Sequence, residues 1–122
     1  MNTIINLTQH AATTEQLAQG VVDCAPEFKE TLGGLLTFEG LPSREEIRGK
    51  ANALAALAVA YGYDAALVGG APYLMSALES ALKAEGVKPL YAFSARESVE
   101  TTLPDGKVVK TTVFRHLGFV ES

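Results

Sequence analysis

Three short apolar runs of the chain are each followed by side chains or glycines that could bind a phosphate group. These segments are Thr8-Gln9-His10, Gly69-Gly70 and Ser94-Ala95-Arg96. Glycine lets backbone amides approach a ligand closely, and the guanidinium fork of arginine matches phosphate oxygens. Histidine exchanges protons near neutral pH. Together, these residue types predict a site for a small anion, provided that the fold brings the three segments together.

The segment from Asp64 to Ser98 contains two of them and predicts a βαβ unit. An apolar strand at 65–68 precedes the glycines, a helix begins at Pro72 and ends before Gly86, and a second apolar strand covers 90–93. Such strands are typical of a parallel sheet covered on both faces, and ligands bind at the carboxyl ends of its strands. The first turn of the helix favours an anion. Alternatively, Gly69-Gly70 is only a tight strand-to-helix turn.

The remainder of the first 62 residues predicts further α/β steps. A strand at 4–7 is followed by a capping box at Thr13–Gln16 and by a short helix that stops at Gly20. A second strand at 21–23, a helix opened by Pro26, a loop at 37–42 or alternatively a short strand at 36–38, and a long helix at 44–61 complete this part. We therefore expect one domain, residues 1–122, with a Rossmann-like three-layer α/β sandwich and a mostly parallel sheet.

The last third of the chain predicts a β-hairpin. Alternating arms at 98–103 and 107–114 flank Pro104-Asp105-Gly106, and Asp-Gly is a strong turn signal. On the second arm Lys110, Phe114 and His116 share one face. This hairpin is either a half-solvated sheet edge or a cover in which Lys110 or His116 leans towards Gly70 and Arg96.

Composition and charge exclude several classes of function. The formal net charge of −4 argues against a protein that coats long nucleic acids. The single cysteine, Cys24, cannot form an internal disulfide, so a reducing cytoplasm is expected. No signal peptide or membrane-spanning stretch is recognisable. Two histidines and one cysteine at distant positions lack metal-ligand spacing, so we expect neither a metal nor a cofactor.

Taken in order, several segments resemble small single-domain CRISPR-associated Rossmann-fold (CARF) proteins. They are residues 8–16, Gly69 to Met75, Leu90 to Arg96 with Glu100, Asp105-Gly106, Lys110 and Phe114-Arg115-His116. The resemblance covers most of the chain and is poorest over residues 21–41. It implies a homodimer whose two sheet edges form one pocket for a cyclic oligoadenylate. Some relatives cleave that ring without a metal, by attack of a ribose 2′-hydroxyl on the adjacent phosphate.

If that chemistry applies, Arg96 would stabilise charge on the phosphorane, and His10 or His116 would act as general acid or base. The candidate ligand-binding residues are Thr8, Gln9, Gly69, Gly70, Ala71, Tyr73, Ser94, Ser98 and Lys110. Two functions stay open. One is a homodimeric nucleotide-binding protein, either a sensor or a metal-independent ring-cleaving phosphodiesterase. The other is a non-enzymatic α/β binding or assembly protein that forms a homodimer.

Overall fold

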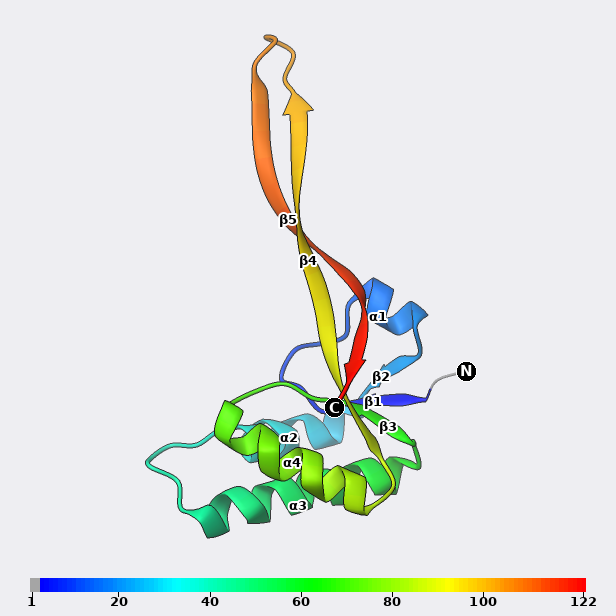
Figure 1. Ribbon diagram of the computed structural model, residues 1–122, viewed down its shortest axis with the longest axis vertical. Coiled ribbons are helices and arrows are strands. Elements are labelled where there is room, and N and C mark those ends of the chain that lie inside the picture. Colours follow the sequence, from blue (N-terminus) through cyan, green and yellow to red (C-terminus); the bar gives the residue numbers. More distant parts are fainter. Residues whose placement is uncertain (1–2) are drawn as a thin grey trace.

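A computed structural model describes residues 3–122 and has a single five-stranded sheet (Figure 1). The strands are β1 (Ile4–Asn6), β2 (Val21–Asp23), β3 (Ala65–Leu67), β4 (Lys88–Thr102) and β5 (Val108–Glu121). The helices are α1 (Thr14–Ala18), α2 (Lys29–Leu36), α3 (Arg44–Tyr61) and α4 (Pro72–Ala84), and a 3-10 turn at Pro26–Phe28 precedes α2. The fold is α/β, with a mostly parallel sheet and a C-terminal antiparallel hairpin, as the sequence predicts.

The strand order is β2-β1-β3-β4-β5, and the direction of winding reverses beside β1. The chain passes from β1 to β2 on one side and then returns to β3 on the other side of β1. Both neighbours run parallel to β1, and Ile5 lies between Val22 and Ala66 in the register. The carboxyl ends of β1, β2 and β3 therefore meet at one edge of the sheet.

Because successive side chains of a strand point to opposite faces of the sheet, the buried residues form one cluster on each face. Ile5 and Ala66 pack with the buried side chains of α2, α3 and α4, among them Leu32, Leu54 and Leu78. Their neighbours along the strands form a smaller cluster of Ile4, Val21, Ala65 and Leu67, against which Phe119 packs. Figure 1 shows α2, α3 and α4 together on one side of the sheet and the short α1 on the other. No helix within residues 3–122 has the length and apolarity needed to cross a membrane.

The helix boundaries follow the capping signals. The Thr13 side chain accepts from the amide of Gln16, whose side chain in turn accepts from the Thr13 amide, so the predicted capping box is confirmed. The Ser43 side chain caps α3 by accepting from the amide of Glu46. Gly62 ends α3 with φ of 77°, a left-handed conformation that glycine adopts without steric cost.

The loop expected at 37–42 is confirmed, and the alternative, a short strand at 36–38, is wrong. Leu36 is the last residue of α2 and is buried in the helical face of the core, and no strand forms at Thr37 or Phe38. The tertiary contact of Leu36 thus outweighs the local β-propensity of this short segment. α2 continues through Gly33 and Gly34 to reach Leu36.

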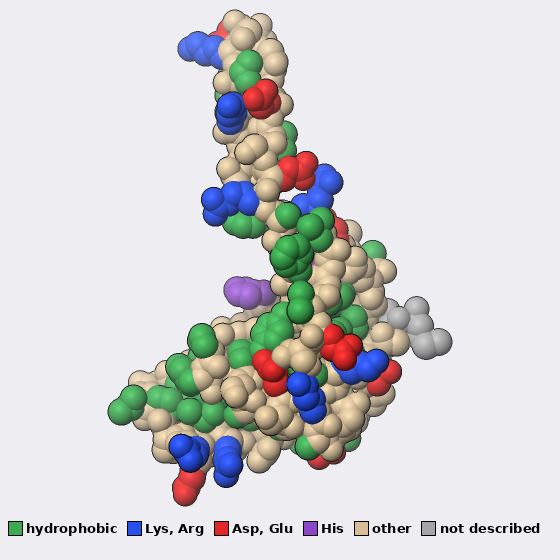
Figure 2. Space-filling view, viewed as in Figure 1, with side chains coloured by type: hydrophobic (Ala, Val, Ile, Leu, Met, Phe, Trp, Pro, Cys, Tyr) green, Lys and Arg blue, Asp and Glu red, His purple; other side chains and the backbone are tan. Residues whose placement is uncertain are grey.

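The hairpin is longer than the sequence predicts. β4 is one continuous strand of 15 residues, whereas two separate segments, 90–93 and 98–103, were expected. Only Lys88–Leu90 pairs with β3, and the following residues pair with β5 alone. The segment from Ser94 to His116, here called the arm, therefore stands out of the body as a two-stranded ribbon (Figures 1 and 2). The predicted Asp105-Gly106 turn is confirmed at its tip, where Gly106 has φ of 88° and Lys107 N donates to Asp105 Oδ1.

Helix α4 is tied to the base of the arm through one carboxylate. The hydroxyl of Tyr91 donates to Glu79 Oε2 at 2.6 Å, and the hydroxyl of Ser122 donates to Glu79 Oε1. The bonds from Ser122 and Tyr91 hold the pKa of Glu79 below its usual value. Burial, followed by the hydrogen bond to Glu79, raises the pKa of Tyr91 well above that of a free tyrosine. Tyr91 is therefore a neutral donor at every physiological pH.

Candidate functional site

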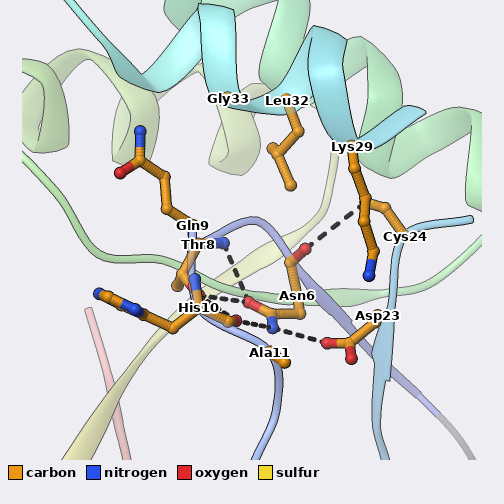
Figure 3. Close-up of a pocket in the computed structure, with 10 residues that line it drawn as sticks. All are labelled: Asn6, Thr8, Gln9, His10, Ala11, Asp23, Cys24, Lys29, Leu32 and Gly33. Atoms are coloured by element: carbon orange, nitrogen blue, oxygen red, sulfur yellow. Dashed lines mark hydrogen bonds between the residues drawn. The ribbon is translucent and has the colours of Figure 1, made fainter. Parts of the chain in front are cut away.

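The loop that joins β1 to α1 separates two hollows at the carboxyl edge of the sheet. The β1–β3 pocket, about 560 Å³, lies between this loop and the residues that follow β3. The β1–β2 pocket, about 370 Å³, lies between the same loop and α2 (Figure 3). Thr8, Gln9, His10 and Ala11 line both of them. The first segment singled out in the sequence therefore forms the wall between the two pockets.

The β1–β3 pocket combines polar groups with an apolar wall. The polar groups come from the β1–α1 loop and from Gly69-Gly70-Ala71, and Leu36, Leu67 and Val68 line it on the apolar side. Tyr91 and Ala92, at the point where β4 leaves the body, complete the lining. Lysine and arginine are absent from this lining. An anion bound here by one copy of the chain would thus be held by amides and by His10.

Asn6 determines the shape of the β1–α1 loop. Its side chain is buried, with 3% of the residue exposed, and all of its hydrogen-bonding capacity is used. Asn6 Nδ2 donates to the carbonyl of His10 and to Asp23 Oδ1, each at 2.8 Å. Asn6 Oδ1 accepts from the amide of Thr8 at 2.9 Å and from its hydroxyl at 2.7 Å. The loop therefore folds back over the end of β1, as Figure 3 shows.

Asp23, at the end of β2, supports the same loop from the neighbouring strand. Its Oδ1 atom accepts from Asn6 and also from the amide of Ala12 at 3.0 Å. Neither Asp23 nor Asn6 was singled out from the sequence. The available signal was an amide side chain within the apolar run Ile4-Ile5-Asn6-Leu7, since a buried polar group needs partners.

The β1–β2 pocket is less suited to an anion or to nucleophilic chemistry. Asp23 contributes a carboxylate to its lining, beside Cys24 and Lys29. Cys24 is buried and its thiol donates to the carbonyl of Asn6 at 3.5 Å. Burial raises the pKa of this thiol, which disfavours the reactive thiolate. Cys24 is thus a packing residue of the core.

The start of α4 lies at the β1–β3 pocket. Gly70 has φ of 152°, which side-chain-bearing residues rarely adopt, and Pro72 occupies the first turn. The residue at the N-cap is Ala71, which lines the β1–β3 pocket and offers no side-chain hydrogen bond to the helix. The helix has 13 residues, so the positive end of its dipole adds to the amides of its first turn at this pocket.

The structure brings together only part of the predicted site. Lining the β1–β3 pocket are Thr8, Gln9, His10, Gly69, Gly70 and Ala71. Tyr73 lies outside the lining and packs edge-on against Phe38, with ring centroids 5.2 Å apart. The others, Ser94, Arg96, Ser98, Lys110 and His116, belong to the arm and line neither pocket.

The arm residues have partners of their own. Arg96 lies over the ring of Phe114, 5.6 Å from its centroid, and Lys110 Nζ is 3.7 Å from Glu100 Oε1. His116 Nε2 is 2.9 Å from the side-chain oxygen of Gln19, which follows α1. In one chain, therefore, neither Lys110 nor His116 covers the glycine turn. Within residues 3–122 no three His, Cys, Asp or Glu side chains come together as metal ligands.

Comparison with known proteins identifies the family of the chain. Residues 2–120 match the model of the Uncharacterized protein MJ1673 family, so the chain belongs to that family. No curated protein and no solved structure matches it.

Proposed function

We propose that this member of the MJ1673 family binds a small anionic nucleotide in the β1–β3 pocket. The observation that carries the proposal is the position of this pocket in the sheet. The pocket lies between the carboxyl ends of β1 and β3, where the winding of the sheet reverses. Open α/β sheets bind their ligands at such a switch point. The predicted Rossmann-like three-layer character, with α1 as the second helical layer, belongs to the same proposal.

The lining of the pocket suits the two parts of a nucleotide. The start of α4 and the loop at Gln9–Ala11 offer hydrogen-bond donors for a phosphate. Leu36, Leu67 and Val68 offer apolar contact, and Tyr91 an aromatic side chain, for a base. Because the chain is acidic overall, a long nucleic acid is not the proposed ligand. The CARF resemblance makes a cyclic oligoadenylate the first candidate, bound by a cytoplasmic homodimer.

The arrangement in one chain favours binding over ring cleavage. Of the three catalytic candidates only His10 lines the pocket, whereas Arg96 and His116 lie on the arm. A metal-independent phosphodiesterase would need these arm residues to come from a second copy. The alternative function, a non-enzymatic assembly protein that forms a homodimer, is favoured by a different observation, the exposed arm itself.

A thermal-shift screen tests the proposal. The ligands are cyclic di-, tri-, tetra- and hexa-adenylates and ordinary mononucleotides, with product analysis of any ligand that binds. At about 100 times its dissociation constant, a ligand stabilises the folded protein by roughly 2.7 kcal/mol, which is a readable shift. A stabilised protein with an intact ligand indicates a sensor, and ring opening indicates the phosphodiesterase.

Two glutamine variants show whether a ligand occupies this pocket. Gln9 lines the pocket and its Nε2 atom donates to Thr37 Oγ1, whereas Gln19 lies outside the lining, beside His116. We expect Gln9→Ala to reduce the shift and Gln19→Ala to retain it. A protein that no nucleotide stabilises, or an equal shift in both variants, would contradict the proposal.

A further inference from the structure

The arm presents a free strand edge beside the β1–β3 pocket. From Tyr91 onward, β4 pairs with β5 on one side and with no other strand among residues 3–122 on the other. This free edge begins at Tyr91 and Ala92, which line the pocket. A two-stranded ribbon by itself is only marginally stable in water, and Val99, Val109 and Val113 are each about 40% exposed on one of its faces. Within the described part of the chain, no third strand pairs with the arm.

The charges on the two edges of the arm distinguish which of them can pair with a second copy. Between Val108 and His116, the charged residues of β5 are Lys110 and Arg115, so two β5 edges placed side by side have no opposite charges to pair. Lysine on an edge strand is a common protection against such pairing. β4 carries Arg96 and Glu100 on one face, four residues apart and opposite in sign. The β4 edge is therefore complementary to itself.

The symmetry of a homodimer then fixes the register. Two neighbouring antiparallel strands are related by a two-fold axis perpendicular to the sheet, which keeps each side chain on its own face. Arg96 must consequently meet an acidic residue of its own face, and on the arm part of β4 that residue is Glu100. We propose that two copies of the chain pair along their free β4 edges, antiparallel, with Ser98 opposite the partner's Ser98 and Arg96 opposite the partner's Glu100.

This pairing brings the tip of each arm to the other copy's pocket. In the same register, Phe93 lies opposite the partner's Leu103, and the tip turn at residues 104–106 approaches Ala92, which lines the pocket. Lys107 directly follows that turn. The dimer thus brings a cation towards a pocket whose own lining contains no lysine or arginine. The inference rests on the homodimer of the proposed function and is independent of nucleotide binding.

Cysteine cross-linking without nucleotide tests the register. Ser98→Cys places two thiols opposite each other at the two-fold axis, within the range of a disulfide. Ser94→Cys is the matched control, because Ser94 is an equally exposed serine on the same face of β4. In the proposed register two copies of residue 94 are eight positions apart along the strand, roughly 26 Å. Under mild oxidation we expect Ser98→Cys to form at least fivefold more covalent dimer than Ser94→Cys.

Cross-linking, sedimentation and hydrogen exchange together decide the inference. Equal cross-linking of the two variants, or a monomeric wild-type chain in sedimentation equilibrium, would overturn it. Preferential cross-linking of Thr112→Cys would overturn it in favour of the β5 edge. In amide hydrogen exchange, dimerisation should protect residues 94–102 and 69–71 and leave the exposed face of α3 unchanged. Slower exchange at residues 94–102 without slower exchange at 69–71 would support the edge pairing but contradict the approach of the arm tip to the other copy's pocket. These readouts need no ligand, so a negative nucleotide screen leaves them intact.

Discussion

At the scale of single residues, Asn6 is the side chain on which the candidate site depends most. It joins the carbonyl of His10, the carboxylate of Asp23 and the amide and hydroxyl of Thr8 in one buried network. Asn6→Ala removes both Oδ1 and Nδ2 of the side chain and leaves several of these groups without a hydrogen-bond partner. Because each buried unsatisfied group costs about 1–3 kcal/mol, we expect the free energy of unfolding to fall by about 3 kcal/mol in urea denaturation.

An exposed asparagine provides the control for this loss. Asn52 lies on the exposed side of α3, and Asn52→Ala should change the free energy of unfolding by less than about 0.5 kcal/mol. If Asn6→Ala were as stable as Asn52→Ala, the loop would be held by other contacts and the network would not define the site.

Sequence reasoning located Thr8, Gln9 and His10 correctly at the pocket because a general property of parallel sheets places them there. The carboxyl ends of adjacent parallel strands meet at one edge, whatever the details of packing. The partners of Asn6 depend instead on where Asp23 ends its strand and on how the chain turns after Leu7. Neither can be derived from local propensity, so the residue that organises the loop was missed.

At the scale of elements, the helices were the most predictable part, because their ends depend on local chemistry. Thr13 and Ser43 each accept a hydrogen bond from an amide three residues further along the chain, and Gly62 ends its own helix. The long helix has the predicted bounds, Arg44–Tyr61. The length of β4 was missed because Ser94-Ala95-Arg96 was interpreted as the end of a strand. Residues 90–103 contain no glycine or proline, which are the residues that usually interrupt a strand.

Helix α1 provides a prediction at this scale. With five residues and no buried side chain, it depends on its capping box more than a long helix would. Thr13→Ala should therefore destabilise α1 by about 1 kcal/mol, which corresponds to roughly fivefold faster amide exchange at Gln16 and Leu17. Thr14→Ala is the control, since Thr14 is also exposed but does not cap the helix. Equal exchange in the two variants would show that packing, rather than the cap, maintains α1.

At the scale of the whole molecule, the arm divides the predicted site into two parts. The carboxyl edge of the sheet holds the glycine turn and the β1–α1 loop, whereas Arg96, Lys110 and His116 stand on the arm beyond it. The sequence predicts the hairpin correctly, but the direction in which a hairpin leaves its sheet depends on where the preceding strand loses its neighbour. Here β3 ends at Leu67, so β4 continues without support on that side.

The dimer proposed for the arm predicts a specific role for Arg96. In the chain itself Arg96 contacts the ring of Phe114 and forms no ion pair with Glu97 or Glu100, which pair instead with Arg115 and Lys110. In the dimer it faces the partner's Glu100, and symmetry creates that pair twice. Arg96→Glu therefore replaces two attractive pairs by two repulsive ones. Cross-strand charge pairs contribute about 0.2–1 kcal/mol each, so we expect the dissociation constant of the dimer to rise about tenfold.

Sedimentation velocity at two salt concentrations, without nucleotide, measures this change. Arg48→Glu makes the same charge change on the exposed side of α3 and should leave the dissociation constant unaltered. Arg96→Lys keeps the positive charge and should retain the dimer. If Arg96→Glu weakened the dimer only by removing the contact with Phe114, Arg96→Lys would weaken it as well. Higher salt should reduce the difference between Arg96→Glu and wild type, because exposed charges are screened. If Arg96→Glu dimerised as tightly as Arg48→Glu, the β4 edges would not meet in this register. Lys107 of one copy would then not be brought to the pocket of the other copy by this pairing.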